Sequence, residues 1–237
     1  MGSGSFFKGL EEINLKKTNL IGIDLEPEED IKNNKKVIQQ DWLKYQIKPD
    51  LKTLIIGNPP FGKMNKLSKE FIKHSVSFDN VYTIAFVLPN VYNKHTLQKV
   101  VPKKYRLKTI YELPRDSFTI DNEDYHVPCS FFVFEKSIGE CLRFNPELYK
   151  ETNDWEYASK PQNGDFYVLG TAPQNVKELN EVNENNRGYY IKVKDPKKIE
   201  KIKDNFRNTT WKGHSSANGG VSWFTKPELV KVYMENN

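Results

Sequence analysis

The sequence predicts an α/β fold, in which helices cover both faces of a mostly parallel sheet that an antiparallel strand closes, followed by a small C-terminal α+β region. From residue 19 to about residue 136, short β-rich apolar runs alternate with helical patterns. The run 82–88 is almost continuously apolar or β-branched, as in a strand covered on both faces. After residue 136 the alternation stops and polar, Asn-rich segments take over, so we expect two domains, 1–140 and 141–237.

Six strands are expected, and the run 82–88 should lie at the centre of the sheet. The strands cover residues 20–25, 36–39, 53–57, 82–88, 107–113 and 129–135. The stretch 114–128 contains prolines and has no helical period. The last two strands should therefore form an antiparallel pair that closes the sheet.

Helical patterns lie between these strands. Apolar residues recur at helical spacing after Asn65, a candidate N-cap, which predicts a helix at 66–76. A second helix is expected at 93–101, where Pro102 ends it, and another at 6–13.

The C-terminal region contains a basic helix. Asp195 is a candidate N-cap and Pro196 suits the first helical position, and Ile199, Ile202 and Phe206 share one face. The segment 191–212 holds eight Lys and Arg residues against three Asp and Glu residues, which indicates either a solvated face or a phosphate-contacting surface. The candidate phosphate contacts are Lys197, Lys198, Lys201 and Lys203. The aromatic residues nearby belong either to a core or to a stacking surface: Trp211, His214, Trp223 and Phe224.

Composition excludes several classes of protein. The 237 residues are 37% hydrophobic and 28% charged, as in a soluble globular chain. No apolar run approaches the roughly 20 residues that span a bilayer, and no secretory signal opens the sequence, so we expect a cytoplasmic protein without membrane partners. The two cysteines, Cys129 and Cys141, form no metal-ligand set with the four histidines, so we expect no metal. The net charge of +5 permits a nucleic-acid partner without requiring one.

The segment 55–62 is the strongest functional signal. An apolar strand runs directly into Asn58, Pro59, Pro60 and Phe61. Two successive prolines end a strand and stiffen the loop at its carboxyl end, which is the edge where open α/β sheets bind ligands. The loop offers a side-chain acceptor on Asn58, the main-chain carbonyl of Pro59 and the flat face of Phe61.

These groups suit methyl transfer to an exocyclic amino group. The nitrogen lone pair of such a group is delocalised into the ring, so the amine is a poor nucleophile. Two acceptors, on Asn58 and Pro59, would hold both hydrogens and favour a more reactive nitrogen. Phe61 would stack on the ring and hold the nitrogen in line with an electrophilic methyl group.

Residues 57–62 resemble motif IV of the S-adenosylmethionine-dependent amino-methyltransferases, particularly the N6-adenine DNA methyltransferases. The resemblance extends over about the first 140 residues and implies a Rossmann-like class I methyltransferase sheet. Residues 20–27 resemble the second strand of that fold, whose terminal acid takes the cofactor ribose; Asp24 matches it, with Glu26 as the alternative. Asp41 and Trp42 match the residues that take the amino group and ring of the cofactor adenine, and Asn58 also borders that site.

The start of the sequence departs from this pattern. Gly2 and Gly4 fit the glycine-rich loop that approaches the cofactor, although Gly-Ser repeats also occur in expression linkers. The strand that precedes this loop in the family, between the strands ending at Asp24 and Gly57, is absent. We therefore expect a fragment, a late-started reading frame, or a chain whose partner supplies the strand, because two strand edges would otherwise stay unpaired.

The resemblance implies an enzyme that methylates adenine N6 in DNA with S-adenosylmethionine as cofactor. The region after residue 140 would position DNA, and Lys63 and Lys66 beside the loop either contact phosphate or solubilise the next helix. RNA adenine methylation, protein glutamine methylation and a catalytically inactive nucleic-acid-binding subunit remain alternatives.

Overall fold

The computed structural model describes residues 4–13, 19–120, 123–125, 127–211, 217–218 and 221–237. The chain forms two compact units. Unit 1 comprises Met1–Pro89 and Gln98–Arg143, and unit 2 comprises Asn90–Leu97 and Phe144–Asn237. The division after Arg143 lies close to the boundary predicted near residue 140. The assignment of residues 90–97 to unit 2 was not predicted, because they directly follow a strand of unit 1.

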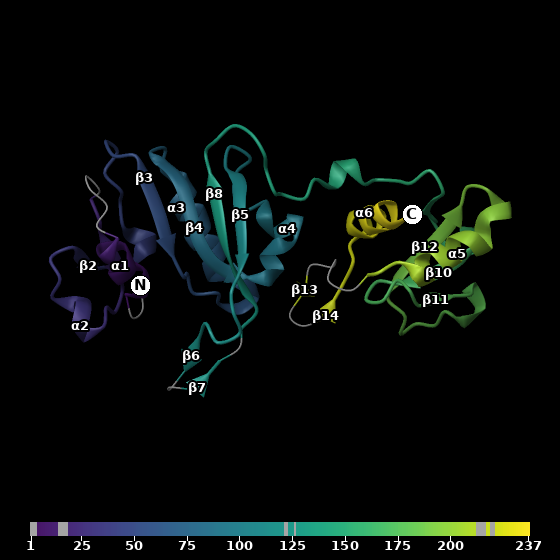
Figure 1. Cartoon of the computed structure of the whole chain (residues 1–237), viewed down its shortest axis with the longest axis horizontal. Helices are drawn as coiled ribbons and strands as arrows, with labels where there is room; N and C mark the ends of the chain where they lie inside the picture. The colour runs from purple at the N-terminus through teal and green to yellow at the C-terminus, as the bar shows by residue number, and fades with distance from the viewer. Residues whose placement is uncertain (1–3, 14–18, 121–122, 126, 212–216, 219–220) are drawn as a thin grey trace. The chain divides into compact units, whose positions relative to one another are not determined.

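Unit 1 is built on a four-stranded sheet of order β3-β4-β8-β5 (Figure 1). Its strands are β3 (Thr53–Gly57), β4 (Val81–Pro89), β8 (Cys129–Glu135) and β5 (Arg106–Glu112). β3 and β4 are parallel, whereas β8 is antiparallel to both of its neighbours. The antiparallel closure and the central position of β4 are thus confirmed. Ile84, Leu88 and Phe132 are almost completely buried, because β4 and β8 are covered on both faces.

Helix α3 (Lys66–Ser77) packs against β4 and buries Ile72 and Val76. Asn65 lies at the N-cap position of this helix, as predicted, but it adopts a left-handed conformation and its side chain makes no capping hydrogen bond. The helix expected at 93–101 is shorter and divided into η3 (Asn90–Asn93) and α4 (His95–Gln98).

A separate lobe of unit 1 holds the parallel pair β1 (Gly22–Asp24) and β2 (Val37–Gln39), with helices α1 (Ser5–Glu12) and α2 (Glu29–Lys32). Ion pairs tie α1 to its neighbours, Lys8 to Asp30 and Glu11 to Lys36. Figure 1 shows this lobe on the β3 side of the four-stranded sheet.

The single sheet expected from the sequence is two sheets. Among the described residues, β1 pairs only with β2, and β3 pairs only with β4. The apolar strand β3 is therefore an edge strand, and Leu54 is 53% exposed. A strand between β1 and β3 would be needed to join the two sheets, and no described segment occupies that position.

The short elements of unit 1 lie in its loops. The stretch 114–128 contains the pair β6 (Thr119–Ile120) and β7 (Glu123–Asp124), and the 3₁₀ turns are η1 (Trp42–Lys44) and η2 (Lys63–Asn65).

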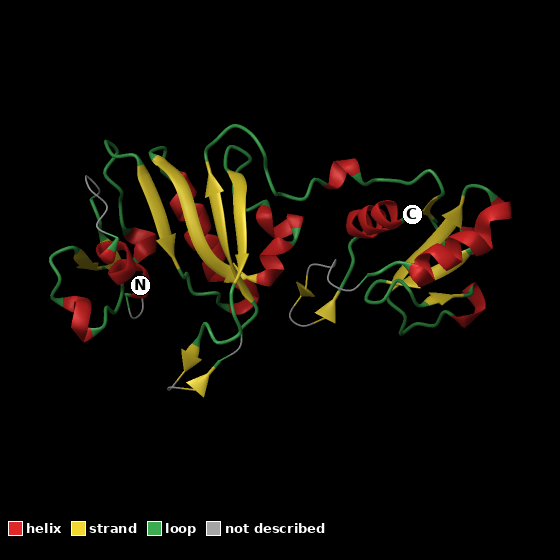
Figure 2. Ribbon diagram, viewed as in Figure 1, coloured by secondary structure: helices red, strands yellow, loops and turns green. Residues whose placement is uncertain are grey.

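Unit 2 is an antiparallel sheet of order β11-β10-β12-β9 with two helices (Figure 2). Its longer elements are β9 (Trp155–Tyr157), β10 (Phe166–Leu169), β11 (Val176–Lys177), β12 (Gly188–Val193), α5 (Ile199–Asn208) and α6 (Lys226–Asn236). Its short elements are η4 (Pro146–Leu148), η5 (Pro161–Asn163), η6 (Leu179–Glu181), η7 (Pro196–Lys198), β13 (Ala217–Asn218) and β14 (Val221–Ser222). Aromatic residues dominate the core, including Trp155, Phe166, Phe206 and Tyr233. As predicted, Asp195 caps the basic helical segment by accepting from the Lys197 amide at 3.1 Å.

The Tyr105 hydroxyl gives a stability prediction for unit 1. It is buried and donates to the Val81 carbonyl at 2.7 Å. Tyr105→Phe should lower the free energy of unfolding by about 1 kcal/mol, because that carbonyl loses its side-chain partner. Urea titration measures the change, and exposed Tyr111→Phe is the control, with no expected loss.

The same hydroxyl sets an alkaline pH dependence. Burial, aided by the Asp79 charge, raises the pKa of Tyr105 from 10.0 to about 12. The unfolded chain loses this proton first, so stability should fall as pH rises from about 10 to about 12. Tyr105→Phe should show a shallower fall; an identical pH profile in both proteins would contradict the assignment.

Candidate functional site at the carboxyl end of β3

The loop Asn58 to Phe61 begins where β3 ends at Gly57. Asn58 and Pro60 are exposed, Pro59 is buried and Phe61 is half-buried. The buried proline anchors the loop, while the Asn58 carboxamide remains accessible to a ligand. The prediction that this turn ends the strand and presents Asn58 at its carboxyl end is confirmed.

The register of the sheet brings the start of α1 to the same end. Gly57 pairs with Phe86, so the following row holds Val87, which pairs with Phe131 of β8. The ring of Phe6 in α1 stacks on Phe131, with 6.1 Å between ring centroids. The N-terminal turn of α1 therefore lies at the level of the sheet where Asn58 begins its loop.

The backbone after the loop adopts conformations that few residues tolerate. Gly62 has φ 65°, and two non-glycine residues, Met64 and Asn65, have φ 54° and 58°. Side chains of α3 support this turn, because the Ser68 hydroxyl donates to the Asn65 carbonyl at 3.1 Å. Left-handed backbone at non-glycine residues is uncommon and clusters near functional sites. Sequence reasoning missed this turn, although asparagine tolerates such a conformation better than most residues.

The two acids expected to bind the cofactor lie together at one end of the β1-β2 pair. Asp24 ends β1 beside Gln39, and the Gln40 amide donates to the Asp24 carbonyl at 2.8 Å. Asp41 follows immediately. Each carboxylate also orders its own loop, since Asp24 accepts from the Glu26 amide at 2.9 Å and Asp41 from the Leu43 amide at 3.0 Å.

Trp42 joins this end of the lobe to α3. Its ring stacks on Tyr45, with 6.1 Å between centroids, and meets the edge of His74 at 5.3 Å. His74 Nε2 lies 3.0 Å from the Tyr45 carbonyl, which completes the link. The indole Nε1 is buried and has no hydrogen-bond partner.

Gly4 precedes α1 in a left-handed conformation, with φ 72°. A Cβ atom there would lie 2.8 Å from Ile31 Cδ1 of α2, so no side chain fits without moving that contact. Gly4 is thus a packed part of the lobe, which disfavours the linker interpretation for this residue. Gly2, also predicted to approach the cofactor, lies outside the described residues.

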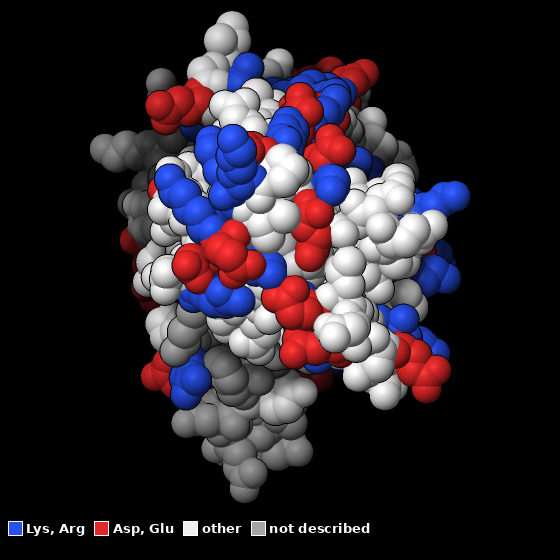
Figure 3. Space-filling view, turned by 90° about the vertical axis from the view of Figure 1, so that its right-hand side faces the viewer, with Lys and Arg blue, Asp and Glu red and all other residues white. Residues whose placement is uncertain are grey.

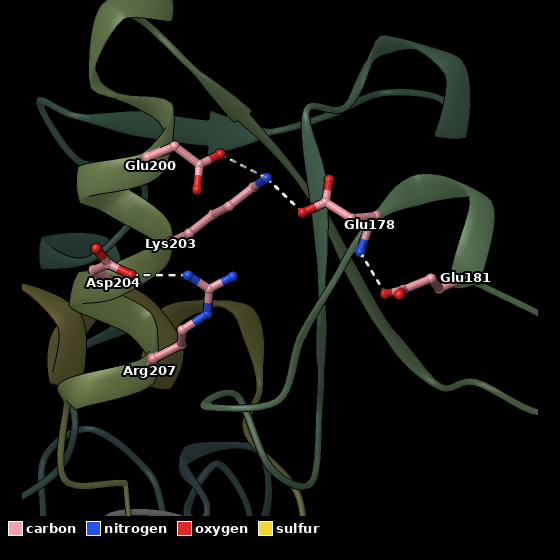
Figure 4. Close-up of polar contacts among 6 residues, drawn as sticks. All are labelled: Glu178, Glu181, Glu200, Lys203, Asp204 and Arg207. Carbon is pink, nitrogen blue, oxygen red and sulfur yellow. Dashed lines mark hydrogen bonds and ion pairs between the residues drawn. The ribbon is translucent and has the colours of Figure 1, made fainter.

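One predicted phosphate contact is wrong. Lys203 has a side chain only 6% exposed, and its ammonium is held by Glu178 at 2.6 Å and Glu200 at 3.0 Å (Figure 4). Burial lowers the pKa of Lys203, but the hydrogen bonds that its ammonium donates to the two carboxylates outweigh this effect, and the pKa lies above the ordinary value. The ammonium therefore joins α5 to the loop after β11 and is not presented to a phosphate.

The other predicted phosphate contacts are exposed and stay predictions. They are Lys63 and Lys66 beside the Asn58 loop, Lys197 and Lys198 in η7 directly before α5, and Lys201 in the first turn of α5. Figure 3 shows Lys and Arg interspersed with Asp and Glu on the face at the right-hand end of Figure 1, where α5 lies. Such mixing weakens any single-sign field.

The aromatic residues of unit 2 divide between core and surface. Trp211 and Phe224 are buried in the core, which favours that interpretation over stacking for both. His214 lies outside the described residues. Trp223 is half-buried and lines a pocket of about 470 Å³ with Tyr167 and Tyr190. The two tyrosines were not predicted from sequence, because alternation in a strand does not distinguish a pocket wall from a core.

Comparison with known proteins leaves the family open. No family model matches the chain, and no curated protein matches its sequence significantly. Across the described ranges, no helix combines the length and apolarity needed to cross a bilayer. Within the same ranges, no group of three or more His, Cys, Asp or Glu residues could hold a metal ion.

The buried ammonium of Lys203 gives a stability prediction for unit 2. Replacing both Glu178 and Glu200 by Gln should lower the free energy of unfolding by about 1–3 kcal/mol, because the charge loses its ionic partners. Adding Lys203→Met should restore most of the loss, since it removes the unpaired charge and keeps an apolar stem. Thermal and urea unfolding measure both changes. No rescue by Lys203→Met, or an equal loss on mutating exposed Lys201, would contradict the ion-pair assignment.

Proposed function

We propose that this protein is the catalytic region of an S-adenosylmethionine-dependent methyltransferase that acts on the N6 amino group of adenine in DNA. The observation that carries the proposal is the accessible Asn58 carboxamide, held at the carboxyl end of β3 by a buried Pro59 and a half-buried Phe61. The order β3-β4-β8-β5, with β8 antiparallel, supports a Rossmann-like class I methyltransferase sheet.

The loop suits a reaction that depends on positioning. The side-chain carbonyl of Asn58 and the main-chain carbonyl of Pro59 each accept a hydrogen bond from the adenine amino group, which reduces delocalisation of the nitrogen lone pair. Phe61 stacks on the base, which must leave the duplex to reach the loop. S-adenosylmethionine, when bound, supplies a methyl group on a sulfonium sulfur. The amino nitrogen forms a bond to that methyl carbon, the sulfur keeps the electron pair of the broken bond, and one amino proton leaves to solvent.

The residues around β1 and β2 fit the cofactor. Asp24 and Asp41 supply two carboxylates at one end of that pair, as ribose hydroxyls and an adenine amino group require. Gly4 provides a backbone without a side chain at the start of α1, and helix N-termini favour the carboxylate of an amino-acid ligand. Trp42 follows Asp41 directly and packs against His74 of α3.

The proposal includes a partner chain that supplies a strand between β1 and β3. The β1-β2 pair and the four-stranded sheet have β1 and β3 at their edges, and apolar side chains are exposed at Leu54 in β3 and at Ile21 just before β1. The chain alone should therefore bind S-adenosylmethionine weakly in calorimetry. Tight binding by a stable monomer would refute the need for a partner strand.

A catalytically inactive nucleic-acid-binding subunit is the second candidate. The division of unit 1 into two sheets favours it, because a complete cofactor site spans both. Incubation of labelled cofactor with DNA, RNA and protein pools separates the candidates. Label in DNA alone supports the proposal. Label in RNA or in protein would mean that the enzyme acts on that substrate instead, and cofactor binding without any label supports the inactive subunit.

The roles of Asn58 and Asp24 can be tested separately. Asn58→Ala should lower the rate of methyl transfer by at least about 100-fold while sparing cofactor affinity, because it removes an acceptor for the reacting amine. Asp24→Ala should first weaken cofactor binding, measured by calorimetry. Asn153→Ala and Asp50→Ala, at exposed positions elsewhere, are matched controls. The opposite order of effects would mean that the two roles are wrongly assigned.

The exposed lysines at the start of α5 test the DNA partner. Changing Lys197, Lys198 and Lys201 together to Gln should weaken DNA binding and reduce the salt dependence of log Kd by about 2 to 3, if each contacts a phosphate. A control triple variant with the same charge change carries Gln at exposed Lys44, Lys48 and Lys99. Equal slopes for the two triple variants would exclude a specific phosphate surface on α5.

A further inference from the structure

Unit 2 contains a pocket that the proposed chemistry does not use. It has a volume of about 470 Å³, within the roughly 300–1,000 Å³ typical of sites for small ligands. Three aromatic residues line it, Tyr167 of β10, Tyr190 of β12 and Trp223. The rings of Tyr167 and Tyr190 lie edge to face, with 4.8 Å between centroids. Tyr190 and Trp223 are half-buried, so both keep some side-chain surface that a ligand can contact.

Two glycines hold the aromatic walls in place. A Cβ atom on Gly170 would lie 2.7 Å from the Trp223 ring, and one on Gly188 would lie 2.0 Å from the Val168 carbonyl and 2.9 Å from the Tyr167 hydroxyl. The Gly170 backbone also fixes both sides of the pocket, because its amide donates to the Arg187 carbonyl at 2.9 Å and its carbonyl accepts from Phe224 at 2.8 Å. The pocket is therefore a built feature of the sheet.

The polar groups of the pocket are mostly donors. The Asn183 and Asn186 carboxamide oxygens accept from backbone amides of their own loop, at 3.0 and 3.1 Å, so these side chains offer their amide nitrogens to a ligand. Arg187 adds a planar guanidinium, and Glu184 adds one acceptor. Tyr167 adds a hydroxyl, which is protonated at neutral pH as in any tyrosine, and burial raises its pKa further.

We propose that this pocket binds one unpaired nucleobase of the nucleic-acid substrate, stacked on Tyr190 and Trp223 and contacted at its edge by Arg187 and the asparagine amides. A base has a π face for the rings and carbonyl or ring-nitrogen acceptors for the amide and guanidinium donors. A sugar lacks this combination of a flat face and in-plane acceptors. The inference rests on the proposed function only in taking nucleic acid as the substrate.

Binding to strands with and without bases tests the proposal. Fluorescence anisotropy of the full chain should show tighter binding to a labelled single-stranded 12-mer of mixed sequence than to an abasic 12-mer with the same phosphates. Tyr190→Ala should weaken binding of the base-bearing strand by about 5- to 150-fold, the range expected for the loss of one stacked base, and leave the abasic strand unchanged. Exposed Tyr111→Ala in unit 1 is the control.

A second variant guards against misfolding of Tyr190→Ala. Arg187 is exposed, so the Arg187→Gln variant should fold. It should weaken binding of the base-bearing strand more than the matched charge change Arg207→Gln does. Equal affinity for base-bearing and abasic strands overturns the proposal, as does an unchanged ratio of the two affinities in both pocket variants. None of these measurements needs a methyl donor. Loss of methyl transfer with an intact base preference would therefore refute the proposed function and leave the pocket assignment standing.

Discussion

The pairing of β4 on both of its edges is the constraint on which the candidate site depends. This nine-residue strand bonds to β3 in parallel and to β8 in antiparallel register, and most of its side chains are buried. A close-packed strand cannot slip by one residue without turning its apolar side chains to the wrong face. The two prolines end β3, and the register of β4 therefore determines the level of the sheet at which Asn58 leaves it.

The same sheet explains why the site can consist of uncharged groups. Asn58, Pro59 and Phe61 do not titrate, so they can assist a reaction only by holding the substrate and by presenting fixed dipoles. Such assistance requires a rigid frame. The buried Pro59, the left-handed turn at Met64 and Asn65 and the support from α3 supply that rigidity on the side of the loop away from β3.

Unit 2 shows how a basic segment can be mostly structural. Ile202 and Phe206 of α5 lie in the core. Lys203, next to Ile202 in the helix, is therefore almost completely buried and pairs with Glu178. A buried ammonium must be paired with an acid, so the Lys203 ammonium is not available to bind a phosphate. In the proposals above, recognition of nucleic acid in this unit therefore depends on exposed lysines at the start of α5 and on an aromatic pocket.

The sequence by itself determined the strands β1 to β5 and β8 of unit 1, the antiparallel closure and the position of the Asn58 loop, because local periodicity and two prolines specify them directly. The residues 53–57 and 129–135 were predicted with the observed bounds. Only the tertiary structure decided that β1 and β3 belong to separate sheets, that Lys203 is buried and that Tyr167, Tyr190 and Trp223 share a pocket. Each of these depends on which distant segments meet, and a linear pattern of residue types carries no record of that pairing.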